Sequence, residues 1–340
     1  MNSSYSELWQ RREQQYLSPF AFRSSSTEGR LKPIDECDLR TDFQRDRDRI
    51  IHAKSFRRLM HKTQCFLSPE GDHYRTRLTH TLEVSQIGRS VARLLCLNED
   101  LVEAACLGHD LGHTPFGHAG ERVLNSLCSG GFSHNEQSVR TVTLLERDGQ
   151  GLNLTVEVID AILCHTGPVS AKTLEGRLIK YADRIAYINH DIDDAIRAGI
   201  LTDNMIPEKY SRVLGENHSK RIDTMVKSLV SATSKNFSRG IAALSMDEDV
   251  EEATLGLREF MFENVYINSK AKKEEGKACE VLARIYEYFY KNPERMPEDN
   301  KKFLDEFGTE RVVADYIAGM TDRYALETYN ELFIPKMWGR

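Results

Sequence analysis

Apolar residues recur every three or four positions along most of the chain after about residue 42, and this spacing constrains the fold more than any other feature. The first such stretch contains Ile50, Ile51, Phe56 and Leu59, and similar stretches follow to about residue 290. This is the spacing of one face of an α-helix. Alternating β-branched runs closed by Asn-Gly or Asp-Gly turns do not recur in any regular way. The sequence therefore predicts an all-α fold.

Helices are expected at residues 101–111, 120–128, 133–147, 156–164, 172–198, 222–230, 251–265 and 274–290. Residues 1–39 contain no sustained periodicity, which predicts a peripheral arm or an ordered coil. Residues 40–200 are expected to form a helical core. Residues 201–340 are expected to form a helical C-terminal region packed on that core.

The composition predicts a soluble globular protein. Hydrophobic residues make up 40% of the 340 residues, charged residues make up 29%, and the formal net charge is −6. No apolar run approaches the roughly 20 residues needed to span a bilayer, and the first residues lack a basic start followed by an apolar stretch. We therefore expect a cytoplasmic protein without a membrane partner. Seven cysteines, none of them in a C-x-x-C pair, argue against a disulfide framework and against a thiolate zinc site.

Positive charge is concentrated in one part of this acidic protein. Residues 40–93 contain twelve Lys or Arg and six Asp or Glu. An exposed helix face on which Arg45, Arg47 and Arg49 pair with neighbouring acids explains this pattern. A phosphate site or a nucleic-acid-binding patch explains it equally well.

A histidine-aspartate doublet, His109-Asp110, closes the short apolar helix expected at residues 101–111. Imidazole nitrogen together with carboxylate oxygen suits a hard or borderline divalent metal. His80, near the start of a helix, and Asp183, inside a long helix, extend the doublet to a set of two histidines and two aspartates. Such a set suits Mn, Mg, Fe, Ni or Zn, and it leaves coordination positions for water and for substrate oxygen.

A second interpretation of the doublet resembles the H-E-x-x-H helix of zinc peptidases, because His109 and His113 are four residues apart. That motif requires one helix to continue through both histidines. Gly112 and Pro115 are expected to end the helix here, and aspartate reaches less far than glutamate. The set of two histidines and two aspartates is therefore favoured.

His118 and Glu121 are three residues apart, so a helical turn places them on one side. A histidine beside a carboxylate can act as a general acid or base near neutral pH. Glu121 is alternatively a first-turn acid favoured by the helix dipole. His134 and Glu136 are further candidates, although Ser133 and Glu136 also have the spacing of a capping box that only starts a helix.

Asp183, Tyr187 and Asp191 follow one another at intervals of four residues and therefore share one stripe of the long helix. A stripe that faces a core should be apolar. Two carboxylates and a phenol on it predict a cavity that these side chains line.

Longer motifs now give these positions a family context. The segments concerned are residues 40–51, 56–59, 62–64, 77–80, 109–121, 182–194 and 315–322. Together they resemble the bacterial dGTP triphosphohydrolase family, whose HD-domain core binds a divalent metal through a His, His-Asp and Asp pattern. The resemblance implies a helical HD-domain core with a helical C-terminal extension. It also implies metal-dependent hydrolysis of dGTP and other deoxynucleoside triphosphates to deoxynucleoside and tripolyphosphate.

The resemblance also implies roles for individual residues. His80, His109, Asp110 and Asp183 would hold the metal. His118 with Glu121 would form the acid–base pair, supported by His134 and Glu136. Gln64 and Asp191 would hold the sugar 3′-hydroxyl, Tyr187 would stack on the deoxyribose, and Arg77, His113 and Arg184 would face phosphate oxygens. The family further leads us to expect a homo-hexamer, with single-stranded DNA or a dNTP as an effector.

Two other functions remain open at the level of sequence. One is a different HD phosphohydrolase, such as a nucleotidase or a cyclic-nucleotide phosphodiesterase. The other is a non-catalytic, nucleic-acid-binding or regulatory HD protein. The presence of both His118 and Glu121 favours an enzyme.

Overall fold

The computed structural model describes residues 5–35, 37–64, 74–267 and 272–336, and these residues are helical with no β-strand. The only β pairing among them consists of isolated bridges between Arg30 and Thr155 and between Thr63 and Thr76. The predicted all-α class is therefore confirmed. Within the described part of the chain, no helix is long and apolar enough to cross a membrane.

The chain divides into two compact units, and each is assembled from three separate stretches of sequence. The first unit contains residues 1–52, 80–109 and 152–270, and the second contains residues 53–79, 110–151 and 271–340. Helix α4 (Arg77–Leu94) begins in the second unit and continues into the first. The peptide bond between His109 and Asp110 also joins the two units.

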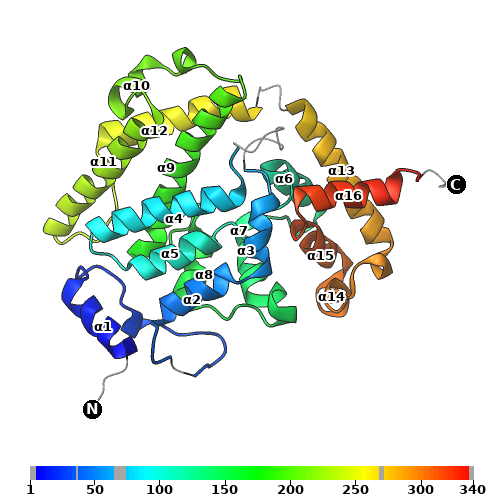
Figure 1. Ribbon diagram of the computed structural model, residues 1–340, viewed down its shortest axis with the longest axis horizontal. Coiled ribbons are helices and arrows are strands. Elements are labelled where there is room, and N and C mark those ends of the chain that lie inside the picture. The colour runs from blue at the N-terminus through cyan, green and yellow to red at the C-terminus, as the bar shows by residue number, and fades with distance from the viewer. Residues whose placement is uncertain (1–4, 36, 65–73, 268–271, 337–340) are drawn as a thin grey trace. The chain divides into compact units, whose positions relative to one another are not determined.

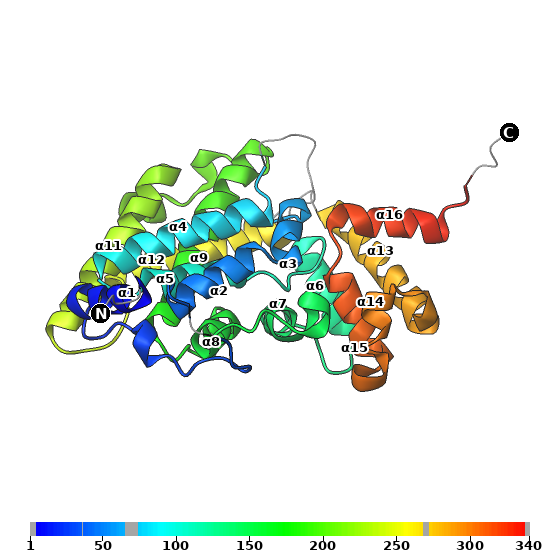
Figure 2. The same ribbon diagram turned by 60° about the horizontal axis from the view of Figure 1, so that its bottom comes forward.

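The first unit is built around α5 and α9. Besides α4, its longer helices are α1 (Tyr5–Tyr16), α2 (Asp42–Ile51), α5 (Glu99–Gly108), α8 (Val156–Cys164), α9 (Leu174–Arg197), α10 (Glu208–Leu214), α11 (His218–Ser238) and α12 (Glu248–Met261), followed by a π-helical turn η6 (Phe262–Ile267). Helix α5 packs against α2, α8 and α9, and α9 packs against α8, α11 and α12. Figures 1 and 2 show α4 and α5 running side by side, with α2 next to α5.

Local sequence explains where these helices start. The side chain of Asn98 accepts hydrogen bonds from the backbone N–H groups of Asp100 and Leu101 and so caps α5. Thr173 caps α9 in the same way through the N–H of Gly176. Gly108 in the last turn of α5 allows α8 to approach closely, because a Cβ there would lie 2.6 Å from Ile162 Cδ1.

The arm expected at residues 1–39 contains a helix, α1, that sequence periodicity did not indicate. Glu13 on α1 accepts hydrogen bonds from Ser24 and from the side chain of Asn98. Buried Glu175 of α9 accepts hydrogen bonds from the backbone N–H groups of Phe22 and Asn98. Burial raises the pKa of Glu175 to about 7. These polar contacts hold the arm on the first unit, together with ring contacts of Phe20 with Phe237 and of Phe22 with Phe43.

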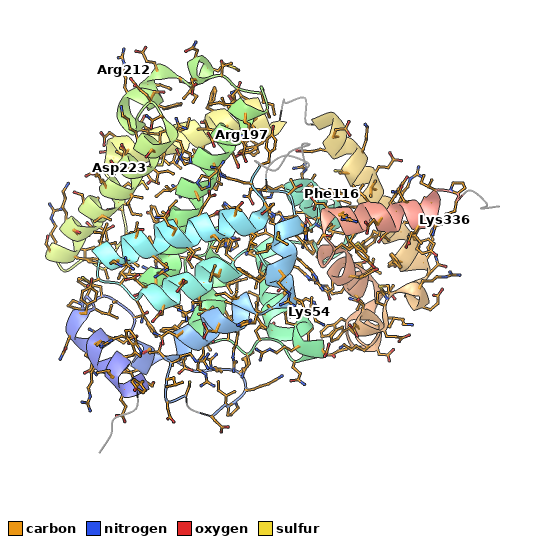
Figure 3. All side chains as sticks on the ribbon, viewed as in Figure 1. Lys54, Phe116, Arg197, Arg212, Asp223 and Lys336 are labelled. Carbon is orange, nitrogen blue, oxygen red and sulfur yellow. The ribbon has the colours of Figure 1, made fainter. Side chains whose placement is uncertain are left out.

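The second unit is built around α13. Its helices are α3 (Lys54–Arg58), α6 (Gly117–Leu127), α7 (His134–Arg140), α13 (Lys272–Lys291), α14 (Glu298–Lys301), α15 (Leu304–Ala318) and α16 (Asp322–Phe333), and a π-helical turn η3 (Thr141–Leu145) follows α7. Helix α13 packs against α6, α15 and α16. Their shared apolar core includes Phe116, Leu124, Leu282 and Ile317. Charged side chains lie on the outer faces of the helices, and in the first unit Arg212, labelled in Figure 3, forms an exposed pair with Glu208.

Candidate active site

His109 lies at the end of α5, in the first unit, and its ring is fixed by the backbone. Its Nδ1 lies 2.6 Å from the carbonyl oxygen of Cys106, so Nδ1 carries the proton and donates it there. The other nitrogen, Nε2, then carries the lone pair. This is how metal-binding histidines are commonly held in proteins.

His80 and Asp183 meet His109 in the interior of the first unit. His80 Nε2 lies 3.1 Å from Asp183 Oδ1, and His109 Nε2 lies 4.0 Å from the same oxygen. Both histidines are buried. Burial opposes ionisation of Asp183, but the hydrogen bond from His80 and the neighbouring imidazoles outweigh it and lower its pKa to about 2. Two imidazole nitrogens and an ionised carboxylate thus converge, and this donor set fits a divalent cation.

Asp110 is joined to His109 by a peptide bond and belongs to the second unit. Its carboxylate Oδ2 accepts a hydrogen bond of 2.6 Å from Arg77 Nη1, and both side chains are buried. Arg77 also donates to the carbonyl oxygen of Gln64 at 3.4 Å. One predicted phosphate contact, Arg77, is therefore bound to one predicted metal ligand, Asp110.

His165 is a further buried histidine that the sequence reasoning missed. It follows the last residue of α8, as His109 follows the last residue of α5, and its Nδ1 lies 2.7 Å from the carbonyl oxygen of Ile162. Its ring meets that of His109 edge-on, with 5.0 Å between the ring centroids. The sequence did contain a signal for His165. Like His109, it directly follows a short apolar helix.

In the second unit, Glu121 lies between two histidines. Its Oε2 lies 3.1 Å from His118 Nδ1, and its Oε1 lies 2.8 Å from both the backbone nitrogen and Nδ1 of His134. His113 stacks on His134, with 4.8 Å between the ring centroids. Glu121 is the fifth residue of α6, beyond the first turn, so its position does not fit the first-turn-acid interpretation. Ser133 makes no side-chain capping bond, and Glu136 is exposed on α7.

The hydrogen bonds of Glu121 determine the charges of this cluster. Burial acts to raise the pKa of Glu121, but the bonds with His118 and His134 outweigh it and hold the pKa far below its ordinary value. Burial acts against protonation of His134, yet Glu121 raises its pKa. Burial and the nearby Arg77 charge keep the pKa of His113 well below 6.5. Near neutral pH, Glu121 is therefore ionised and His113 is neutral.

The predicted stripe of α9 faces partners from α12 and η6, all within the first unit. Arg184 forms a salt bridge of 2.7 Å with Glu251, and Tyr187 Oη accepts a hydrogen bond of 2.8 Å from Arg258 Nε. Tyr266 donates a hydrogen bond from its hydroxyl to Asp191. Burial raises the pKa of Asp191 and raises that of Tyr187 to about 12. The sequence reasoning missed all three partners, because they lie more than 60 residues away along the chain.

Three of the residues predicted to contact the substrate have buried polar atoms without a hydrogen-bond partner among the described residues. These atoms are Oε1 of Gln64, both ring nitrogens of His113 and Oδ1 of Asp191. Leaving such atoms unsatisfied costs about 1–3 kcal/mol each, so a folded protein retains them mainly where a ligand or water completes them.

Comparison with known proteins places this arrangement in a family. Residues 77–188 match the HD domain, and residues 244–331 match the phosphohydrolase-associated domain. A deoxyguanosinetriphosphate triphosphohydrolase-like protein of Caldanaerobacter subterraneus is 56% identical over 98% of this chain and 96% of its own length. A protein of the same description from Clostridium tetani is 50% identical over 94% of each chain. The chain belongs to this triphosphohydrolase-like family.

As a member of this family, the protein is a hydrolase with an HD domain. The HD match includes His80, His109, Asp110 and Asp183, and the phosphohydrolase-associated match begins shortly before α12. A hypothetical protein from Aquifex aeolicus, solved by crystallography, aligns with a TM-score of 0.47 at 21% identity, over 86% of this chain and 68% of that one. At that score the alignment adds nothing to the family assignment.

Proposed function

We propose that this HD hydrolase is a metal-dependent triphosphohydrolase that cleaves dGTP and other dNTPs to deoxynucleoside and tripolyphosphate. The convergence of His80 and His109 on Asp183 is the observation that carries the proposal. The names of the close relatives support the substrate class. The clustered histidines around Glu121 support an enzyme over a non-catalytic binding protein.

His80, His109, Asp110 and Asp183 are the residues that would hold the cation. A divalent cation bound there would neutralise charge on the phosphates and make the attacking water more acidic. The bond from His109 Nδ1 to the carbonyl oxygen of Cys106 leaves Nε2 as the nitrogen of the neutral ring that would bind the cation. Asp110 would bind both the cation and Arg77, and so would orient the guanidinium for a phosphate oxygen.

Proton transfer is assigned to His118 and Glu121, with His134 in support. The leaving 5′ oxygen needs a proton, because it departs as an alkoxide when water attacks the α-phosphorus. The His118 side chain is 68% exposed, so its ring can reach a ligand, and its Nδ1 lies 3.1 Å from Oε2 of Glu121. Bonding of Glu121 to His134 restrains the carboxylate from the other side. Glu136 is exposed on α7 and would act only as an outer contact.

The sugar and phosphate contacts keep the roles that the family resemblance implies. Gln64 and Asp191 would both bind the 3′-hydroxyl, which would donate its one hydrogen to one of their two buried and unsatisfied oxygens. Tyr187 would pack against the deoxyribose, because the bond from Arg258 fixes its ring. His113 and Arg184 would join Arg77 at the phosphates. Neutral His113 would contribute a hydrogen bond rather than a charge.

Product analysis tests the proposal. The protein would be incubated with Mn²⁺ or Mg²⁺ and each of the four dNTPs, alone and mixed, and the products separated by chromatography. We expect equal amounts of deoxynucleoside and tripolyphosphate. His109→Ala should abolish turnover with every metal, whereas Lys291→Ala, which removes an exposed charge from α13, should not change it. Release of orthophosphate, or opening of a cyclic nucleotide, would instead indicate another HD phosphohydrolase.

A further inference from the structure

One buried carboxylate of the second unit, Asp322, joins two segments that carry residues with proposed roles in sugar binding and proton transfer. Asp322 is the first residue of α16, and its side chain is buried. Its Oδ2 accepts hydrogen bonds from the backbone N–H and the hydroxyl of Thr63, the first of them at 2.9 Å. Its Oδ1 accepts a hydrogen bond of 2.9 Å from the backbone N–H of Phe116. Each oxygen of this carboxylate therefore holds a different segment.

The segment around Thr63 carries the proposed sugar contact Gln64, which follows Thr63 directly. The carbonyl oxygen of Gln64 accepts a hydrogen bond of 3.4 Å from Arg77. Its backbone is thus held by Arg77 on one side and, through Thr63, by Asp322 on the other. Its buried side-chain Oε1 has no hydrogen-bond partner within the described part of the chain. The direction of this amide therefore depends on the backbone that Asp322 holds.

The segment around Phe116 leads into the helix that carries the proposed proton donor. Phe116 directly precedes α6 and has left-handed backbone angles, with φ of 61° and ψ of 26°. A residue with a large side chain rarely adopts this conformation, which persists only where the surrounding structure holds it. The bond to Asp322 and the burial of the Phe116 ring in the apolar core provide that restraint. His118 and Glu121 lie in the first two turns of α6, so a shift at Phe116 would move both.

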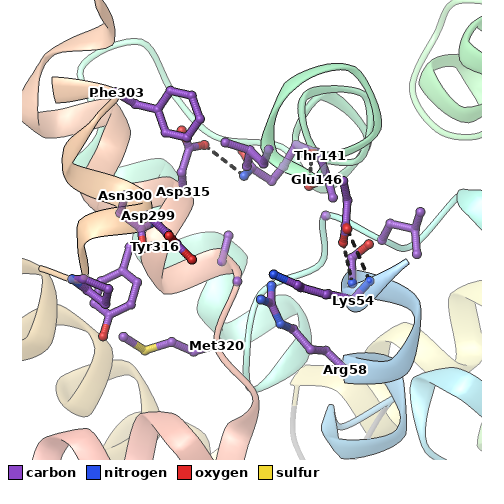
Figure 4. Close-up of a pocket in the computed structure, with 18 of the residues that line it drawn as sticks. Lys54, Arg58, Thr141, Glu146, Asp299, Asn300, Phe303, Asp315, Tyr316 and Met320 are labelled. Carbon is purple, nitrogen blue, oxygen red and sulfur yellow. Dashed lines mark hydrogen bonds between the residues drawn. The ribbon is translucent and has the colours of Figure 1, made fainter. Parts of the chain in front are cut away.

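Lys62 adds a second link between the same parts of the chain. It directly precedes Thr63, and its Nζ donates hydrogen bonds to the carbonyl oxygen of His113 and, at 2.7 Å, to that of Ala318, the last residue of α15. The loop that begins at Ala318 and leads to Asp322 borders a cavity of about 360 Å³ (Figure 4). Open space on one side of this loop removes packing partners there. Hydrogen bonds from Lys62 and Thr63 therefore contribute more to its position.

We propose that Asp322 is a positioning residue, which aligns the sugar contact Gln64 with the proton donor His118 by holding both segments through one carboxylate. The inference rests on the proposed function for the roles of Gln64 and His118. Proton transfer to the leaving 5′ oxygen requires the donor within hydrogen-bond reach of that oxygen, while the sugar is held through its 3′-hydroxyl. A carboxylate bonded to both segments sets the spacing between these two contacts. Asp322 acts through Gln64 and His118 and is assigned no contact with the substrate.

Hydrogen exchange tests the link without turnover. Asp322→Asn keeps the size of the side chain, but an amide has one acceptor oxygen in place of two and so cannot hold both segments. Mass spectrometry of peptides spanning residues 59–64 and 113–118 should show exchange at least about tenfold faster in one or both, because a hydrogen bond to a charged group is lost. Peptides from α9 should not change. Glu327→Gln, which removes an exposed carboxylate from the same helix, is the matched control and should leave both peptides unchanged. Unchanged exchange of both peptides in Asp322→Asn would overturn the proposal, whether or not the protein hydrolyses dNTPs.

Two substrates separate positioning from a general loss of stability. The metal-loaded proteins would hydrolyse dGTP and its 3′-deoxy analogue, which lacks the hydroxyl assigned to Gln64. In Asp322→Asn, kcat for dGTP should fall about 10- to 100-fold with a smaller change in KM, because a misplaced proton donor slows the reaction while the phosphate contacts remain. The ratio of kcat/KM for dGTP to that for the analogue should fall at least about tenfold. This ratio does not depend on the fraction of protein that is folded, so an unchanged ratio would overturn the positioning role.

Thr63→Val provides a milder test of the same contact, because it removes the hydroxyl bond to Asp322 and keeps the backbone bond. It should lower the ratio in the same direction by a smaller factor. The double variant Asp322→Asn/Thr63→Val should lose less than the product of the two single effects, because both changes act on one contact. A loss equal to that product would overturn the proposed path from Asp322 through Thr63 to Gln64.

Discussion

Glu121 is the residue on which the charges of the proposed acid–base cluster depend. It binds His118 and His134 at the same time, and these two bonds outweigh the effect of its burial. Sequence spacing predicted the pair of His118 and Glu121, because both lie on one helix. It gave no information on the bond from His134, since a contact between two helices depends on how they pack.

Glu121→Gln should change the pH dependence of stability in a defined direction. The folded pKa of His134 is raised above its ordinary 6.5, so its contribution is present below that pH and is lost as pH rises through the folded pKa. The pKa of Glu121 is lowered, so its contribution is present above 4.5 and lost only in acid. The difference in free energy of unfolding between wild type and Glu121→Gln should therefore be largest between these values and shrink above pH 6.5. Urea titrations at several pH values measure it.

Glu327→Gln is the control for this experiment, because Glu327 forms an exposed pair with Arg323 on α16. Its effect on stability should vary little across the same range. A difference between wild type and Glu121→Gln that grew as the pH rose above neutral would contradict the assigned charges.

His165 should strengthen metal binding by positioning His109, although we do not count it among the metal ligands. Its ring packs edge-on against that of His109 and limits how His109 can rotate. His165→Ala should weaken Mn²⁺ affinity by about 10- to 100-fold, which is typical for residues that orient a ligand. Competition with a chelator measures this affinity. His165→Phe, which keeps a ring, should recover part of it, and equal affinities in all three proteins would refute the positioning role.

At the scale of elements, periodicity predicted α8 to the residue and α9 and α13 to within two residues at each end. It was less accurate for the helix expected at 222–230, which runs as α11 from His218 to Ser238, and it did not show where a helix changes form. The helix expected at 133–147 ends as α7 at Arg140 and continues as the π-helical turn η3, and the one expected at 251–265 becomes η6 after Met261. A π-helical turn keeps the apolar spacing of a helix, so a pattern of hydrophobicity does not distinguish it.

Gly112 fixes how α7 approaches the segment that follows Asp110. A Cβ at this position would lie 2.1 Å from the backbone nitrogen of Ser138, a distance that requires the backbone to move. Gly112→Ala should lower the free energy of unfolding by about 2 kcal/mol or more, as overpacking against backbone does. Urea denaturation measures the change.

Gly276→Ala provides a matched control, since Gly276 is exposed on α13 and a Cβ there would contact nothing within 4 Å. It should raise the free energy of unfolding by about 0.5–1 kcal/mol, because alanine favours a helix more than glycine does. Equal effects of the two substitutions would contradict the close approach at Gly112.

At the scale of the whole molecule, segments of the first unit alternate with segments of the second along the sequence. No shift in composition marks where one ends, because each is completed by segments from distant parts of the chain. The domain limits at residues 39 and 200 therefore stay a prediction. Assembly into a homo-hexamer also stays a prediction, and light scattering of the purified protein measures it.

Divalent metal should stabilise the folded protein, because the ligands converge only after folding. Binding at 100 times the dissociation constant would add about 2.7 kcal/mol to the free energy of unfolding. Mn²⁺ should therefore raise the urea midpoint of wild type, and EDTA should reverse the increase. Asp183→Asn should lose this response, whereas Lys291→Ala should keep it. A metal response retained in Asp183→Asn would place the cation elsewhere.

The most direct measurement is the fate of the oxygen atom that enters during hydrolysis. The metal-loaded protein would hydrolyse dGTP in water enriched in a heavy oxygen isotope, and mass spectrometry would locate the label. Attack at the α-phosphorus predicts labelled tripolyphosphate together with unlabelled deoxyguanosine. Label in deoxyguanosine, or labelled orthophosphate as the main product, would contradict a triphosphohydrolase.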